Sequence, residues 1–245
     1  MEIIYELFGS LPRQGPGDNE STKKALSYLT DLPSNPHILD VGCGVGMQTL
    51  ELARSIDGKI IALDNYQPFL DALNNKAQNL RLADKIETLN QSMLEMNFNP
   101  EYFDLIWSEG AVFIYGFEQA LEDWQKFLKK NGYLVLSEAC WFKEDIPDDL
   151  NEFWMAAYPA IKHINEDLEV IKSKNLTIIS HFKLPESSWW EDFYKPLEKN
   201  IKKLQKKYNN DKDKLMQIDE ISLEIEMFRK YSDYYGYEFF ILKKP

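Results

Sequence analysis

Residues 37–53, HILDVGCGVGMQTLELA, join a short apolar segment to a glycine-rich turn and then to a helical pattern. The glycines are Gly42, Gly44 and Gly46, and the helical spacing of apolar residues begins at Met47. Glycine lets the backbone bend tightly and lets a ligand approach without a Cβ in the way. The helix that follows directs unpaired N–H groups and its positive dipole end at the same place. This stretch predicts a strand, a ligand-binding loop and a helix.

The spacing of the glycines distinguishes this loop from a dinucleotide site. The dinucleotide pattern G-x-G-x-x-G requires glycine at position 47, where this chain has Met47. The third glycine comes one residue earlier, at Gly46, and the pattern from Asp40 is D-x-G-x-G-x-G. The sequence therefore argues against a nucleotide-dependent dehydrogenase, which we keep as an alternative.

An acidic residue ends the next predicted strand. The segment KIIALD, residues 59–64, is apolar and ends at Asp64, 18 residues beyond Gly46. A carboxylate at the tip of the second strand, about 20 residues after the glycine loop, accepts hydrogen bonds from a ribose diol. Asp64 is the predicted ribose ligand.

Strands and helices alternate through the rest of the chain. The predicted strands after Asp64 are residues 85–89, 103–107, 133–138, 176–183 and 237–242, and a helix is expected over 116–130. Such alternation predicts an α/β fold, a doubly wound, seven-stranded, mostly parallel sheet. Two apolar stripes at helical spacing predict a helical insertion before the last strand.

We expect one domain over residues 1–245, because no linker or repeat divides the chain. Its predicted parts are an N-terminal loop and helix (1–34), a cofactor-binding core (35–184), a helical insertion or lid (185–235) and the last strand (236–245). The insertion could also form a dimer surface, which makes a homodimer possible.

Five motifs follow one another in the order that is typical of one enzyme family. ILDVGCGVG, IIALDN, NQSM, FDLIWSEGA and GYLVLSE resemble the motifs of class I S-adenosylmethionine-dependent methyltransferases over residues 35–140. The combination is most similar to the small-molecule branch that includes ubiquinone and menaquinone biosynthesis methyltransferases. The resemblance implies a Rossmann-like fold, S-adenosylmethionine as cofactor, and methyl transfer to a small-molecule acceptor by in-line displacement.

The resemblance also implies a set of cofactor-binding residues in the loops that follow the first four strands. They are Asp40, Gly42, Gly44, Gly46, Asp64, Asn65, Ser92, Met93, Ser108 and Gly110. In the family, the glycine loop holds the methionine part of the cofactor. The third-strand loop usually offers an Asp to the adenine amino group, and this chain has Ser92 there. The backbone of Met93 is the alternative adenine contact.

Methyl transfer does not demand a fixed catalytic signature. The enzyme aligns the nucleophile with the methyl group and excludes water, and a base is needed only when the nucleophile arrives protonated. Glu109 is the weak catalytic candidate, with orientation of the cofactor or simple solvation as alternatives. Glu109, Trp141 and His181 are the predicted substrate-binding residues. A non-catalytic S-adenosylmethionine-binding protein that uses the insertion as a partner surface remains the second hypothesis.

Charge and composition disfavour several other classes. Net charge is −12, and residues 1–140 carry 11 basic against 20 acidic side chains, which is unsuited to a phosphate backbone. The loop Ser108-Glu109-Gly110-Ala111 also lacks the [DN]-P-P-[YFW] pattern of base-modifying enzymes, so no nucleic-acid partner is expected. Three histidines and two cysteines without ligand spacing predict no metal. The absence of a long apolar run and of a leader-like start predicts a cytoplasmic protein without a membrane span.

Overall fold

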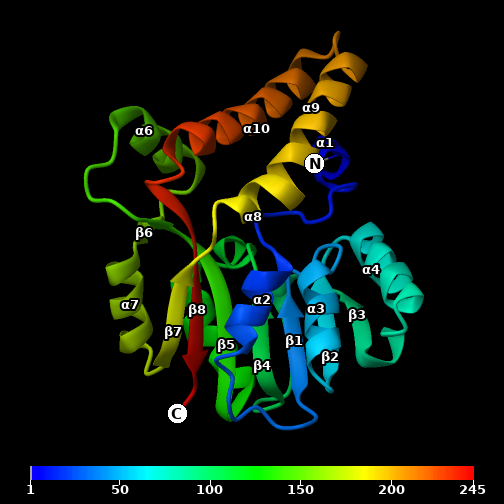
Figure 1. The fold of residues 1–245 in the computed structure, drawn as a ribbon, viewed down its shortest axis with the longest axis vertical. Helices are drawn as coiled ribbons and strands as arrows, with labels where there is room; N and C mark the ends of the chain where they lie inside the picture. The colour runs from blue at the N-terminus through cyan, green and yellow to red at the C-terminus, as the bar shows by residue number, and fades with distance from the viewer. Residues whose placement is uncertain (1) are drawn as a thin grey trace.

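One mixed β-sheet organises the computed structural model, which describes residues 2–245 (Figure 1). The sheet order is β3-β2-β1-β4-β5-β8-β7, and β6 pairs with β5. The strands are β1 (His37–Val41), β2 (Lys59–Asp64), β3 (Ile86–Asn90), β4 (Phe103–Ser108), β5 (Leu128–Trp141), β6 (Lys162–His163), β7 (Thr177–Lys183) and β8 (Tyr235–Lys243). Within the described residues, β8 is antiparallel to β5 and β7, and the other pairs are parallel. The predicted doubly wound sheet is confirmed, with the two-residue β6 as an addition.

Helices cover both faces of this sheet. They are α1 (Glu2–Phe8), α2 (Asn19–Leu26), α3 (Met47–Ser55), α4 (Gln67–Asn79), α5 (Phe117–Asp123), α6 (Asp148–Ala157), α7 (Ile164–Ser173), α8 (Ser187–Trp189), α9 (Lys195–Lys207) and α10 (Lys212–Tyr231). The apolar side chains of α2, α3 and α4 belong to one buried cluster, whereas those of α5 and α7 belong to a second. Apolar burial on the two faces therefore fixes the sheet between two helical layers.

The helical insertion lies beyond the carboxyl ends of the parallel strands. Between β7 and β8 the chain forms α8, a π-helical turn (Trp190–Tyr194), α9 and α10, as the sequence pattern predicts. Helices α9 and α10 project from this edge of the sheet in Figure 1. The first helix packs on α9, where Asn200 Nδ2 donates a hydrogen bond to the Leu7 carbonyl at 2.7 Å. The N-terminal segment therefore connects the insertion to the ligand edge of the sheet.

One local expectation was wrong. The helix predicted over 116–130 ends at Asp123, a 3₁₀ turn follows, and β5 begins at Leu128 instead of Tyr133. Asn131 adopts a left-handed φ of 61° inside the strand, where the pairing register with β4 shifts. Asn131 and Gly132 therefore belong to an irregular strand instead of a helix end, because pairing with β4 outweighs the local helical pattern. Residues 2–8 form α1, a helix to which the sequence analysis assigned no structure.

Candidate functional site

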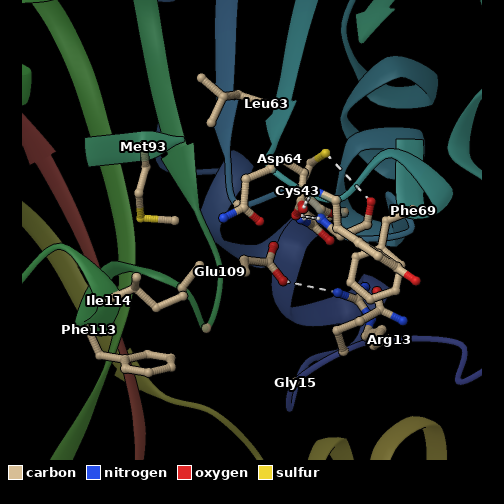
Figure 2. A pocket seen from close by; sticks show the side chains of 18 of the residues that line it. Arg13, Gly15, Cys43, Leu63, Asp64, Phe69, Met93, Glu109, Phe113 and Ile114 are labelled. Carbon is tan, nitrogen blue, oxygen red and sulfur yellow. Dashed lines mark hydrogen bonds and ion pairs between the residues drawn. The ribbon is translucent and has the colours of Figure 1, made fainter. Parts of the chain in front are cut away.

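A cavity of about 290 Å³ opens at the carboxyl ends of β1, β2, β3 and β4 (Figure 2). The sheet order reverses between β1 and β4, and such a switch point is where doubly wound sheets bind ligands. We call this space the first cavity. Eight of the predicted site residues line it: Gly42, Gly44, Asp64, Asn65, Ser92, Met93, Glu109 and Gly110.

The glycine loop needs left-handed backbone at all three glycines. Their φ angles are 72° at Gly42, 54° at Gly44 and 78° at Gly46, which side chains with a Cβ rarely adopt. A Cβ at Gly46 would lie 2.2 Å from Leu73 Cδ1, in the contact between α3 and α4. A Cβ at Gly44 would instead lie 2.6 Å from Gln14 Oε1, at the cavity wall. The absence of a side chain at Gly46 therefore allows α3 and α4 to pack closely. The absence of a side chain at Gly44 leaves space at the cavity wall.

Asp64 stands at the end of β2 with both carboxylate oxygens engaged by the backbone. One oxygen accepts the Gly44 N–H and the other accepts the Tyr66 N–H, each at 2.9 Å. Each oxygen keeps a further lone pair, so the carboxylate can still accept from a diol in the cavity. Burial raises the pKa of Asp64 in spite of these two hydrogen bonds.

Asp40 lies under the loop and does not line the first cavity. Its side chain is fully buried, and it accepts hydrogen bonds from Thr49 and Gln48 at the start of α3. Burial raises the pKa of Asp40 to about 7, and the nearby Glu109 carboxylate adds to the rise. Asp40 therefore links the end of β1 to the first turn of α3 through hydrogen bonds, and this stabilises the glycine loop between them.

The loops after β3 and β4 complete the wall. Ser92 caps a short 3₁₀ turn, where its hydroxyl accepts a hydrogen bond from the Leu94 N–H. The buried Met93 side chain lies against Gly42: a Cβ added at Gly42 would be 3.2 Å from Met93 Cε. Ser108 is fully buried, does not line the cavity, and donates to the Val41 carbonyl at 2.9 Å. Ser108 thus holds β4 against β1, and Gly110 forms the wall itself.

Glu109 is held by three protein donors. Its Oε1 accepts from Thr22 Oγ1 at 2.8 Å and from Trp107 Nε1 at 2.9 Å. Its Oε2 accepts from Arg13 Nη1 at 3.1 Å, an ion pair drawn in Figure 2. Burial raises the pKa of Glu109, while the Arg13 charge opposes that rise. These contacts give Glu109 an anchoring position beside the cavity and leave little capacity for taking a proton from a substrate.

Arg13 and Gln14 are site residues that the sequence analysis did not identify. Gln14 Oε1 accepts the Val45 N–H in the glycine loop at 2.8 Å, and its Nε2 donates to the Phe8 carbonyl at 3.1 Å. Both residues lie in LPRQGPG, whose glycines and prolines gave no periodic signal. The long-range contacts of this segment therefore place it over the glycine loop.

A second cavity, of about 370 Å³, adjoins the first beneath the helical insertion. Seven residues line both cavities: Tyr5, Gln14, Gly15, Pro16, Phe69, Gly110 and Phe113. The remaining lining residues of the second cavity come mainly from α6, the insertion and β8. The chain thus places a ligand site on the glycine loop directly beside an aromatic chamber.

Two predicted substrate-binding residues line neither cavity. Trp141 is buried at the end of β5, where it packs edge-on against Trp154 and Tyr235. His181 lies on β7, and its Nδ1 is 2.6 Å from Glu238 Oε1 on β8. Trp141 is therefore held in packing away from both cavities, whereas the His181 side chain is 38% exposed on the edge strand β7 and is paired with Glu238. Substrate binding by these two residues stays a prediction from the sequence.

Residues 38–132, which contain the glycine loop and Asp64, match the family described as "Methyltransferase domain". Over these residues the chain resembles the class I methyltransferases. It is similar to sterol 24-C-methyltransferase of Debaryomyces hansenii, 31% identical over 128 residues, which cover 52% of this chain and 33% of that protein. It is also similar to demethylmenaquinone methyltransferase of Lactiplantibacillus plantarum, 29% identical over 125 residues, 50% of this chain and 53% of that protein. The chain therefore spans about a third to a half of these methyltransferases.

A solved structure has the same fold as this chain. A SAM-dependent methyltransferase from Thiobacillus denitrificans, in complex with S-adenosyl-L-homocysteine, superposes with a TM-score of 0.86 at 17% identity. The superposition covers 100% of this chain and 99% of that one, so the likeness includes the helical insertion. Two further properties concern residues 2–245: no helix has the length and apolar character to cross a bilayer, and no cluster of three metal-ligating side chains occurs.

Proposed function

We propose that this chain binds S-adenosylmethionine in the first cavity and transfers its methyl group to a small-molecule acceptor in the second. The observation that carries the proposal is that the two cavities adjoin and share lining residues such as Gly110, while Gly44 and Asp64 of the cofactor motifs line the first cavity. The bound cofactor supplies a methyl group activated by a sulfonium, which an acceptor lone pair displaces in line to leave S-adenosylhomocysteine.

The charge of the first cavity fits a sulfonium better than a pyrophosphate. Asp64 and Glu109 line this cavity, and Arg13 is the one basic side chain among its described lining residues. Arg13 is already paired with Glu109, so a pyrophosphate would meet carboxylates without a free cation. The positively charged sulfonium of S-adenosylmethionine would instead be stabilised by the negative potential of these carboxylates. This favours S-adenosylmethionine over NAD, the cofactor of the alternative dehydrogenase.

The protein's own part in the proposed reaction is to bind, orient and exclude water. Gly44 allows close approach of the methionine part, Asp64 accepts from the ribose, and Met93 packs on the adenine side. Tyr5 and Phe69 line both cavities and screen the junction from solvent. Alignment of two reactants at such a junction supplies much of the rate, and no dedicated base is required of this chain.

Calorimetric titration of S-adenosylhomocysteine, with NAD as the control ligand, tests the cofactor. We expect micromolar binding of S-adenosylhomocysteine and no detectable binding of NAD. Binding of NAD alone would replace the proposal by the dehydrogenase alternative. Absence of binding by both ligands to folded protein would contradict a cofactor role for the first cavity.

Formation of S-adenosylhomocysteine from S-adenosylmethionine, followed over a panel of small acceptors, tests turnover. We expect acceptor-dependent formation of S-adenosylhomocysteine by the wild-type chain. Tight cofactor binding without turnover on any acceptor would instead favour the non-catalytic binding protein. A cytoplasmic location, a homodimer, the lack of a nucleic-acid partner, and the lid role of residues 185–235 stay predictions from the sequence.

A further inference from the structure

The second cavity combines aromatic walls with one charged group. Ten of its eighteen lining residues are aromatic, and Glu224 is the one Asp, Glu, Lys, Arg or His side chain among those described. Aromatic walls bury the apolar body of a ligand and leave few polar groups to orient it. A lone carboxylate in such a space disfavours any acceptor that carries a carboxylate or a phosphate. The cavity therefore selects by charge as well as by shape.

Glu224 stands in the middle of α10 and reaches the cavity from the helical insertion. Its Oε1 accepts a hydrogen bond from Tyr194 Oη at 2.8 Å. Burial raises the pKa of Glu224, and Tyr194 is the one group that opposes this rise. No Lys, Arg or His of the described residues forms an ion pair with this carboxylate. The Glu224 carboxylate is half-buried and has no counter-ion among the described residues, which is unfavourable, and a ligand cation would reduce that cost.

The aromatic rings provide further surfaces that attract a cation. Trp189 lies against Tyr237 with ring centroids 5.0 Å apart, and both rings line the cavity. Tyr237 also borders Gly110, where an added Cβ would lie 3.2 Å from Tyr237 Cε2. Aromatic faces attract ammonium groups most strongly where water is excluded. Aromatic surface thus continues from the Glu224 side of the cavity to the junction with the cofactor site.

These observations deepen the proposed function and rest on it. We propose that the second cavity selects an apolar acceptor that carries a protonated amine, with the ammonium group held by Glu224 and the aromatic rings. A neutral phenol or quinol would leave the Glu224 carboxylate without a counter-charge, and an anion would be repelled. The ammonium group is the recognition element, and the atom that receives the methyl group is a separate question.

Three probes of similar size and different charge test this inference: phenethylamine, 2-phenylethanol and 3-phenylpropanoate. Each is titrated by tryptophan fluorescence, because Trp154 and Trp189 line the cavity, and by calorimetry. We expect phenethylamine to bind at least about tenfold more tightly than 2-phenylethanol, and 3-phenylpropanoate to bind most weakly, as expected for a charged contact. Equal affinities, or a preference for 3-phenylpropanoate, would overturn the inference.

Matched variants assign the preference to Glu224. Glu224→Gln removes the charge but keeps an acceptor for Tyr194, and it should weaken phenethylamine binding by about tenfold while leaving 2-phenylethanol unchanged. Glu220→Gln makes the same charge change at an exposed position of α10 and should leave all three probes unchanged. Equal effects of the two variants would contradict a local role for Glu224. Thermal melting checks that each variant is folded, and Tyr194→Phe, which keeps the carboxylate, should retain the amine preference.

The cofactor titration separates this inference from the proposed function. S-adenosylhomocysteine is titrated into wild type and Glu224→Gln, and equal affinity is expected because Glu224 does not line the first cavity. The three probes are titrated both with and without S-adenosylhomocysteine. Failure of S-adenosylhomocysteine to bind would reject the proposed function, whereas normal cofactor binding without an amine preference would reject only the acceptor class.

Discussion

Arg13 Nη1 and Glu109 Oε2 lie 3.1 Å apart in a buried ion pair whose side chains are only 5% and 4% exposed. The pair joins the segment between α1 and α2 to the end of β4, 96 residues away. Because Glu109 also accepts hydrogen bonds from Trp107 and Thr22, it holds three chain segments around the first cavity. This relationship favours a positioning role over the base role that the sequence suggested for Glu109.

Glu109→Gln should destabilise the fold and weaken cofactor binding together. Removing one member of a buried ion pair leaves the other charge uncompensated, and we expect the free energy of unfolding to fall by about 3 kcal/mol. Urea unfolding and calorimetry with S-adenosylhomocysteine measure the two effects, with exposed Glu152→Gln as the control. Unchanged stability and cofactor affinity with complete loss of turnover would instead identify Glu109 as a chemical participant.

Asp64→Ala should lower the affinity for S-adenosylhomocysteine by about 10- to 100-fold, the size expected for lost charge-assisted hydrogen bonds. The variant also removes the acceptor for the Gly44 and Tyr66 N–H groups, whereas Asp64→Asn keeps one acceptor oxygen and should lose less. Calorimetry measures both affinities. Asp71→Ala, exposed on α4, is the charge-matched control. A folded Asp64→Ala protein with normal affinity would reject the ribose assignment.

Valine at two glycines of the loop should give different defects. Gly44→Val places side-chain atoms at the cavity wall beside Gln14, so cofactor binding should be lost. Gly46→Val drives its side chain into Leu73 at a positive φ and should mainly lower thermal stability. Melting curves and calorimetry on both variants measure the contrast. Normal cofactor binding by Gly44→Val would contradict the placement of the ligand on this loop.

Ionisation of Glu138 should make the free energy of unfolding depend on pH. Burial raises the pKa of Glu138 to about 8, although the nearby Tyr158 hydroxyl opposes this rise. Since the folded-state pKa lies above the unfolded value, the acid form favours folding. Its contribution is complete below the unfolded pKa of 4.5 and is lost as pH rises through 8.

Glu138→Gln should therefore gain stability relative to wild type as pH rises, because the amide carries no charge to bury. We expect the difference in free energy of unfolding to grow by about 2–4 kcal/mol between pH 5.5 and 8.5. Urea unfolding at the two pH values measures this, and exposed Glu152→Gln should show no such trend. A difference that does not vary with pH would contradict burial of an ionisable Glu138.

The helix expected over 116–130 and the residues Trp141 and His181 show where local pattern was insufficient. A helical stripe, an aromatic segment and a histidine near a strand end are each compatible with several environments. Pairing of β5 with β4 and β8, and of β7 with β8, decided these environments. In contrast, Gly42, Gly44 and Asp64 lie together at the first cavity, because their spacing follows from backbone geometry within one strand–loop–helix unit. Their role as cofactor ligands stays a prediction.

The sequence by itself determined the doubly wound sheet, the glycine loop and the methyltransferase motifs, since periodicity and left-handed glycines act over a few residues. Only the tertiary structure decided that Arg13 pairs with Glu109, that Gln14 contacts the glycine loop, and that Glu224 lines the aromatic second cavity. Those placements depend on burial and ion pairing between segments far apart in the chain. Such contacts form only when the sheet and the insertion have packed together, and no local pattern encodes them.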